Sequence, residues 1–266
     1  MVLNRRAVVG MVLLAGLPLA ARAQAEPVRV GIVLMHGKGG MPSQLVGVAA
    51  VLERQGFLVA NLEMPWSKRR AYDVDVSTAE GEVVSALDAL RKKGAQKLFV
   101  AGHSQGGLFV LYFASRHAVD GVIAIAPGGN VAAAVFREKL GESVALARRL
   151  VAQGQGDVPV GLTDFESSRG TNTVTTTPAV YLSWFDPEGA MNQAKAEQGI
   201  DPAIPVLFIA PTRDYPGLRS VKQQMFDGLP RNPRNQLYEP DASHMEAPAA
   251  SLGIIATWTT SIAGTR

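Results

Sequence analysis

Short apolar runs rich in β-branched residues alternate along the chain with longer runs whose apolar residues have helical spacing. The short runs predict strands over residues 28–35, 57–62, 98–101, 121–126, 205–210 and, more weakly, 236–238. The longer runs predict helices over residues 43–54, 77–93, 108–116 and 249–262. This alternation is typical of a mainly parallel sheet that helices cover on both faces. We therefore expect an α/β fold with a six-stranded sheet and with functional residues at the carboxyl ends of its strands.

Residues 130–200 break this alternation. A helical pattern over residues 131–152 is interrupted at Gly141, and residues 154–177 are rich in Gly, Ser and Thr with no clear period. Residues 180–185 fit either a short strand or the start of a helix. A long segment of this kind is typical of an insertion over the sheet, so we expect a small cap or lid here.

The first 25 residues have the three-part composition of an export signal. Arg5 and Arg6 precede an apolar run that ends near Ala20, and small residues follow at alternate positions up to Ala25. The run is short for a membrane span and contains Pro18, although an uncleaved anchor helix stays an alternative. We expect residues 1–25 to be a signal peptide. The domain 26–266 would then be periplasmic or secreted, with no membrane span and with either the general or the twin-arginine export route open.

The expected mature domain has neither net charge nor cysteine. Cleavage would remove Arg5, Arg6 and Arg22 but no acidic residue, so the formal charge would fall from +3 to zero. A neutral domain lacks the basic surface that nucleic-acid binding needs, and we expect no such partner. The lack of cysteine excludes disulfides, zinc–thiolate sites, iron–sulfur clusters and a cysteine nucleophile.

The segment Gly102-His103-Ser104-Gln105-Gly106 lies between a predicted strand and a predicted helix. Its G-x-S-x-G pattern is that of a nucleophile elbow, a turn so tight that the positions two before and two after the serine must lack bulk. Such a turn holds the serine hydroxyl exposed at the edge of the sheet, with a helix N-terminus behind it that favours negative charge. An ordinary glycine-rich turn is the alternative. We predict that Ser104 is a nucleophile.

A general base and an orienting acid are expected after Ser104 in the chain. His244 lies in a loop after the last predicted strand, from which its ring can reach the elbow, although a lone loop histidine is also a common surface residue. Asp214 follows the predicted strand 205–210, and the order Ser, Asp, His is that of known triads on such sheets. Asp186 and Asp241 are the alternative acids.

The loop Met35-His36-Gly37-Lys38-Gly39-Gly40 follows the first predicted strand and exposes backbone N–H groups. A tetrahedral oxyanion needs two fixed N–H donors, for which we choose the backbone of Lys38 and that of Gln105. A phosphate-binding P-loop is excluded because Gly39 follows the lysine, and a dinucleotide fingerprint is excluded by Pro42. His36 has no second ligand at metal-binding spacing.

With these motifs in this order, residues 28–262 resemble the α/β-hydrolase superfamily. The chain looks most like its small bacterial esterase-like or dienelactone-hydrolase-like members. The resemblance implies that Ser104 is the nucleophile, Asp214 the orienter and His244 the base, with Lys38 and Gln105 as backbone oxyanion donors. The two N-terminal strands usual in the family have no counterpart here, which leaves a reduced form of the fold. A serine nucleophile disfavours the chemistry of dehalogenases and of dienelactone hydrolases themselves.

We therefore predict a serine hydrolase that cleaves small carboxylic esters through an acyl-enzyme and needs no metal or organic cofactor. Trp66 and Trp184, with Phe185, are candidates to line an apolar substrate pocket, and core packing is their alternative role. A peptidase or thioesterase with the same triad, or a non-catalytic periplasmic binding or accessory protein on the same fold, stays open as an alternative function.

Overall fold

The computed structural model describes residues 28–264. Its main sheet has six strands, all parallel, in the order β2-β1-β3-β4-β7-β8. The strands are β1 (Val30–Met35), β2 (Leu58–Leu62), β3 (Lys97–His103), β4 (Gly121–Ile125), β7 (Val206–Ile209) and β8 (Gln236–Tyr238). The predicted six-stranded parallel sheet is confirmed. Each strand end lies within a few residues of its expected position. The predicted signal peptide, residues 1–25, lies outside the described residues.

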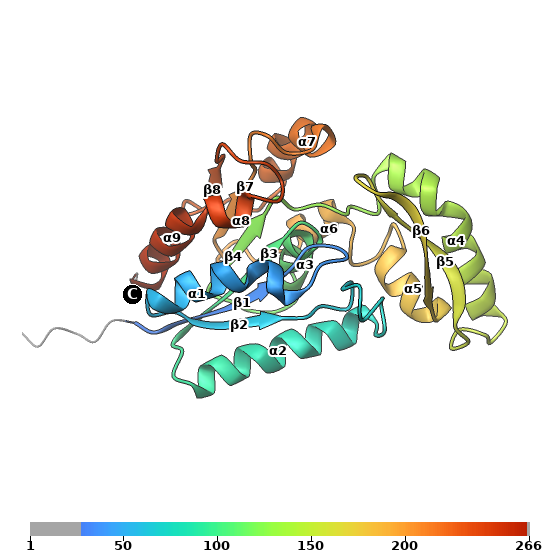
Figure 1. The fold of residues 1–266 in the computed structure, drawn as a ribbon, viewed down its shortest axis with the longest axis horizontal. Helices are drawn as coiled ribbons and strands as arrows, with labels where there is room; N and C mark the ends of the chain where they lie inside the picture. Colours follow the sequence, from blue (N-terminus) through green and yellow to red (C-terminus); the bar gives the residue numbers. More distant parts are fainter. Residues whose placement is uncertain (1–27, 265–266) are drawn as a thin grey trace, which may run out of the picture.

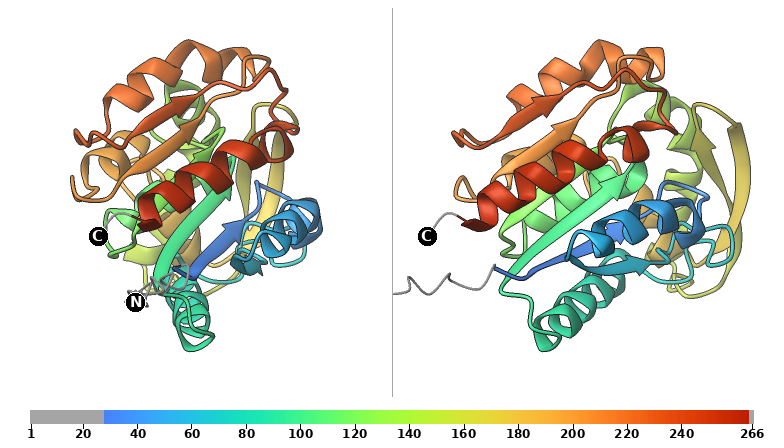
Figure 2. Two further views of the ribbon diagram at one scale, coloured as in Figure 1. Left: turned by 90° about the vertical axis from the view of Figure 1, so that its left-hand side faces the viewer. Right: turned by 60° about the vertical axis from the view of Figure 1, so that its left-hand side comes forward.

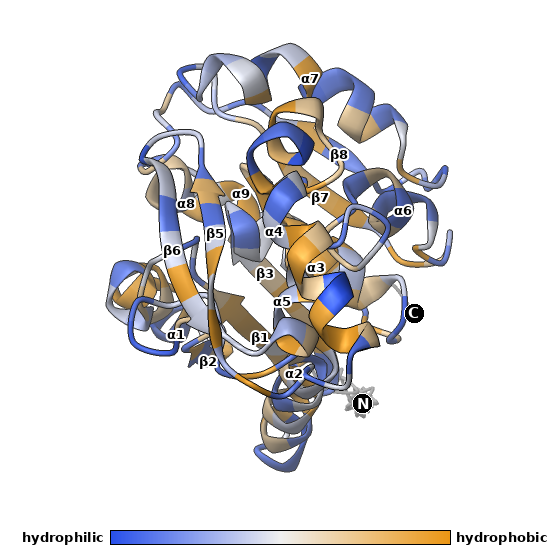
Figure 3. Ribbon diagram, turned by 90° about the vertical axis from the view of Figure 1, so that its right-hand side faces the viewer, coloured by the Kyte–Doolittle hydropathy of each residue, from blue (hydrophilic) through white to orange (hydrophobic). Residues whose placement is uncertain are grey.

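Helices cover both faces of this sheet, and the central strands are apolar on both sides. On β1, Ile32 and Leu34 pack toward one face, whereas Val33 and Met35 pack toward the other, because successive side chains of a strand point in opposite directions. One face carries α1 and α9, which Figure 2 shows side by side, and α2 lies on the opposite side of the sheet. Figure 3 shows the hydrophobic residues gathered on the strands and the hydrophilic residues on the outer helices.

The helices of this layer arrangement have the following bounds: α1 (Val46–Arg54, preceded by the 3-10 turn η1, Pro42–Leu45), α2 (Val76–Lys92), α3 (Gln105–Ala114), α7 (Pro216–Asp227), α8 (Ala247–Ala250) and α9 (Leu252–Gly264). The sequence analysis did not predict α7, although Leu218, Val221 and Met225 have helical spacing within it. No helix within residues 28–264 is long and apolar enough to cross a membrane.

Most of the segment between β4 and β7 forms a separate layer beyond one end of the sheet, at the right of Figure 1, whereas its last helix, α6, lies beside α3. The segment consists of α4 (Ala134–Ala152), the antiparallel hairpin of β5 (Val160–Glu166) and β6 (Gly170–Thr176), α5 (Pro178–Phe185), and α6 (Gln193–Gln198), which packs against α3. We call α4, β5, β6 and α5 the cap layer. Whether this layer moves as a lid stays a prediction.

Three local expectations for this segment were wrong or incomplete. Gly141 does not interrupt α4, because a glycine at an exposed helix position costs only about 1 kcal/mol. The stretch without clear period contains the hairpin, whose strand β6 buries only Val174 and Thr176 and therefore shows little apolar alternation. Residues 180–185 belong to the helix α5, which begins at Pro178 after a cap by the Thr177 side chain.

Candidate active site

The chain reverses from β3 into α3 through a single residue, Ser104. Its backbone has φ 56° and ψ −118°, a conformation that residues other than glycine rarely adopt. The Ser104 N–H donates to the Ile125 carbonyl at 2.9 Å, and its own carbonyl accepts from the Gly128 N–H at 3.1 Å. A Cβ on Gly102 would collide with the Gly106 carbonyl, and a Cβ on Gly106 would lie 2.5 Å from the Met35 carbonyl oxygen. Tight packing therefore holds the strained serine at this turn.

Asp214 and His244 meet at the same edge of the sheet. The loop after β7 and the loop after β8 are joined by a parallel bridge between Arg213 and Ser243, the residues that precede the two side chains. His244 Nδ1 lies 2.7 Å from Asp214 Oδ1, and both side chains are buried. A carboxylate can only accept, so Nδ1 donates and Nε2 of His244 is left with the lone pair that a general base needs.

The two alternative acids lie elsewhere. Asp186 ends α5 and pairs with Arg148 in the cap layer. Asp241 is exposed, and it pairs with Arg213 at 3.0 Å. Of the three candidates, the structure brings only Asp214 to the imidazole of His244.

His244 is also supported from two other sides. The His103 ring, directly before Ser104, lies with Nε2 2.9 Å from the His244 carbonyl oxygen and therefore donates to it. Burial lowers the pKa of His103 to about 4, so this ring is neutral at physiological pH. The Tyr215 ring lies 4.6 Å from the His244 ring between centroids. The sequence analysis placed His103 in the elbow but missed this contact, because no local pattern links residues 141 positions apart.

Ser104 and His244 line one cavity, but no hydrogen bond joins the Ser104 hydroxyl to any group within residues 28–264. In catalytic sites generally, a hydrogen bond between a nucleophile and its base often tightens only when substrate binds. The roles of Ser104, Asp214 and His244 stay predictions.

The loop after β1 passes beside the elbow, where a Cβ on Gly37 would lie 3.1 Å from Ser104 Cβ. His36 fixes this loop, since its Nδ1 donates to the Gly37 carbonyl at 2.8 Å and its Nε2 accepts from the Met64 N–H at 3.0 Å. Within residues 28–264, the backbone N–H groups of Lys38 and Gln105 have no hydrogen-bond partner. Lys38 and Gln105 line the same cavity as Ser104, and their role as oxyanion donors stays a prediction.

No protein-family model and no curated protein sequence matches the chain. The solved structures that resemble it include a monoacylglycerol lipase of Paleococcus ferrophilus, with 22% identity, a TM-score of 0.62, and coverage of 89% of this chain and 96% of the other. Est1E from Butyrivibrio proteoclasticus gives 15% identity, a TM-score of 0.58 and coverage of 92% of each chain. An α/β-hydrolase enzyme from a sediment metagenome of the Mar Chica lagoon, Morocco, gives 19% identity, a TM-score of 0.55 and coverage of 88% and 91%.

The chain has the α/β-hydrolase fold. Within the described residues no strand precedes β1. In an α/β-hydrolase fold, the elbow, the loop after the first strand and the two late loops converge at the carboxyl edge of the sheet. Ser104, Lys38, Asp214 and His244 lie on those four segments.

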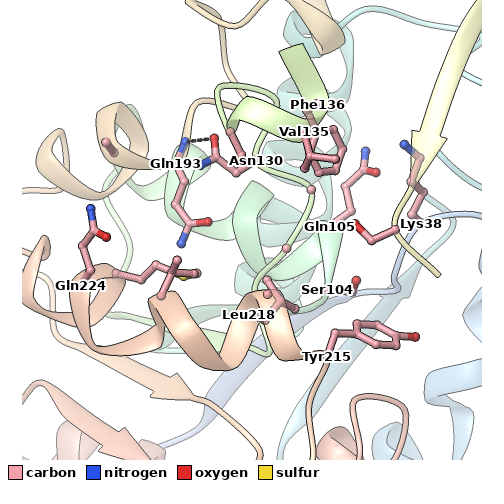
Figure 4. A pocket seen from close by; sticks show the side chains of 18 of the residues that line it. Lys38, Ser104, Gln105, Asn130, Val135, Phe136, Gln193, Tyr215, Leu218 and Gln224 are labelled. Atoms are coloured by element: carbon pink, nitrogen blue, oxygen red, sulfur yellow. Dashed lines mark hydrogen bonds between the residues drawn. The ribbon is translucent and has the colours of Figure 1, made fainter. Parts of the chain in front are cut away.

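A cavity of about 870 Å³ opens beside Ser104 and runs between the start of α4, α6 and α7. Figure 4 shows Ser104 and Lys38 at one side of it and Gln224 at the other, with Leu218 of α7 projecting in between. Phe136, Leu218, Val221 and Met225 contribute an apolar lining. The cavity is large enough for a medium-sized organic molecule.

The prediction that Trp66 and Trp184 line this pocket is wrong. Each side chain is about 1% exposed, and their rings contact one another at 5.6 Å between centroids. Their indole N–H groups donate to the carbonyls of His36 and Val74, which satisfies the polar atom of each buried ring. Trp66 therefore packs in the core against Trp184, which belongs to α5 of the cap layer, and neither side chain lines the cavity described above.

The Lys38 side chain ties the loop after β1 to the cap layer. Its ammonium forms an ion pair with Asp164 of β5, donates to the Phe165 carbonyl at 2.9 Å, and lies 5.3 Å from the centroid of the Phe185 ring. Phe185 is buried beside this ammonium group and does not line the cavity. Within residues 28–264, no three His, Cys, Asp or Glu side chains are grouped closely enough to hold a metal ion.

Proposed function

We propose that the protein is a serine hydrolase that cleaves carboxylic esters, with Ser104, His244 and Asp214 as its triad. The observation that carries the proposal is the buried Asp214–His244 hydrogen bond of 2.7 Å beside a cavity that the strained Ser104 also lines. The structural neighbours add support, since those described above include a monoacylglycerol lipase.

In the proposed reaction His244 Nε2 accepts the Ser104 proton while Oγ attacks the ester carbonyl. The Lys38 and Gln105 N–H groups stabilise the oxyanion that forms, a contribution of several kcal/mol for a pair of donors. Protonated His244 gives its proton to the departing alcohol, which leaves an acyl-enzyme. A water molecule, deprotonated by His244, then releases the acid and restores Ser104.

Asp214 makes this exchange possible because it holds the imidazole with Nδ1 protonated and Nε2 free. The same carboxylate also accepts from the Tyr215 N–H at 2.6 Å, which fixes its own orientation. We further propose that residues 1–25 direct export and are removed, so that the enzyme acts in the periplasm or outside the cell.

The proposal is tested with a fluorophosphonate probe and a panel of esters, amides and thioesters. We expect the probe to label Ser104, and Ser104→Ala to lower kcat by roughly 10³-fold or more. Ser220→Ala, at an exposed serine of α7, is the matched control and should keep wild-type activity.

Full esterase activity in Ser104→Ala would refute the nucleophile. A wild-type protein that neither reacts with the probe nor cleaves any ester would instead favour a binding protein on this fold. A preference for the amide or the thioester would show that the substrate is not a carboxylic ester, but it would leave the assignment of the triad unchanged.

A further inference from the structure

The part of the cavity away from Ser104 is bounded by α6, which packs along α3. At the start of α6 the Gln193 N–H donates to Asn130 at 3.2 Å, and at its end a Cβ on Gly199 would lie 2.9 Å from Ser115 Cβ. Ser115 follows the last turn of α3, whereas Ser104 precedes its first turn. Since helices rise 1.5 Å per residue, Glu197 lies on the order of 10 Å from Ser104, near the far end of the cavity.

Glu197 is a cavity-lining carboxyl that is almost completely buried. Its residue is 4% exposed, and that of Gln193 is 3% exposed. Gln193 Nε2 donates to Glu197 Oε1 at 2.7 Å, and Glu197 Oε2 faces Gly228, where an added Cβ would lie 2.7 Å from it. Within residues 28–264 the Glu197 carboxyl forms no ion pair, and the Gln193 side chain is its only hydrogen-bond partner. One carboxyl oxygen is therefore left without a donor.

The charges around the cavity favour a cation at this end. Asp227, at the end of α7, is a second acidic residue in the lining beside Gly228. Among residues 28–264, the only lysine or arginine in the lining is Lys38, which belongs to the Ser104 side and is paired with Asp164. A bound cation at the far end would therefore meet acidic groups with no competing basic side chain.

An apolar stretch separates this acidic end from the serine. Leu218, Val221 and Met225 of α7 line the cavity together with Phe136 of α4. A substrate that fills the space would need an apolar chain of matching length between its ester and its far end. A chain ending in a methyl group would bury Glu197 without providing the missing partner, which is costly for a polar group.

We propose that the preferred ester carries an ammonium group at the end of an apolar chain, and that Glu197 and the Gln193 side-chain carbonyl accept its hydrogen bonds. This inference rests on the proposed function for its reaction, but the ammonium site can be measured separately. Gln193 can accept through Oε1 while its Nε2 remains bonded to Glu197. Burial raises the pKa of Glu197 to about 7 when no ligand is bound, and a bound cation would stabilise its charged form.

The test compares esters whose chain ends in ammonium or in methyl. Methyl 6-aminohexanoate is paired with methyl heptanoate, and 6-aminohexyl acetate with heptyl acetate, so that the chain is extended on the acyl or on the alcohol side. We expect Glu197→Gln to lower the amino-to-alkyl ratio of kcat/KM by about tenfold or more in at least one pair, as lost charge-assisted hydrogen bonds imply. Glu142→Gln, which removes the same charge from an exposed position of α4, should leave both ratios unchanged.

A calorimetric titration with n-hexylammonium measures the site without any reaction. We expect binding to the wild-type protein and at least a tenfold weaker affinity for Glu197→Gln. The ammonium site would be overturned, and the esterase left intact, if the protein hydrolyses esters but Glu197→Gln changes neither the amino-to-alkyl ratios of kcat/KM nor the affinity for hexylammonium. Glu197-dependent binding without hydrolysis of any ester would support the site and overturn the esterase.

Discussion

Replacing Ser104 by glycine should make the protein more stable than replacing it by alanine. Both substitutions remove the hydroxyl, which has no hydrogen-bond partner within residues 28–264, so neither leaves a group unpaired. They differ in the Cβ alone. Alanine keeps the unfavourable backbone at φ 56° and ψ −118°, whereas glycine adopts positive φ without steric cost.

The magnitude follows from two opposing effects. Holding a non-glycine residue in such a conformation costs of order 1–3 kcal/mol. Glycine gains conformational entropy in the unfolded chain, which lowers stability by about 0.4–1 kcal/mol. The free energy of unfolding of Ser104→Gly should therefore exceed that of Ser104→Ala by about 1 kcal/mol, which corresponds to a Tm higher by roughly 2–4 °C for a domain of this size.

Urea unfolding and thermal denaturation of the two variants measure the difference. The same pair of substitutions at Ser220, inside α7, gives a control of opposite sign, because glycine in a helix costs about 1 kcal/mol relative to alanine. If glycine were less stable than alanine at position 104, by as much as it is at position 220, the strain at the elbow would be absent and our account of the turn would be wrong.

Two further predictions concern His103 and the N-terminal segment. Since burial lowers the pKa of His103 from 6.5 to about 4, the unfolded chain binds a proton between these pH values that the folded protein does not. Stability should therefore fall as pH drops from 6.5 toward 4, by about 2 kcal/mol more between pH 7 and pH 5 than in His103→Gln; parallel stability curves in urea titrations would contradict this. N-terminal sequencing of the exported protein should begin near Glu26, and a start at Met1 would rule out cleavage.

The fold was predictable because its signals are local. A buried parallel strand is apolar on both faces, so runs such as residues 121–126 stand out between helical runs whatever their partners are. The elbow is also largely local, since Gly102, Ser104 and Gly106 lie within five residues and a Cβ on Gly102 would collide with the Gly106 carbonyl, although Gly106 itself is constrained by the backbone of Met35 on β1. The β5–β6 hairpin was missed because it buries few side chains and shows little apolar alternation.

The choice of partners was decided by the tertiary structure. The position of Asp214 after a predicted strand favoured it as the acid but left Asp186 and Asp241 open, and the pairing of two late loops is what brings Asp214 to His244. Trp66 looked suited to a pocket but is sealed beneath the cap layer.

The sequence by itself thus determined the parallel sheet and the strained serine turn, because both depend on short-range sterics and periodicity. Only the tertiary structure determined which acid faces His244 and that Glu197 lies at the end of the cavity. These contacts join segments that are distant in the chain, and packing rather than local pattern brings them together.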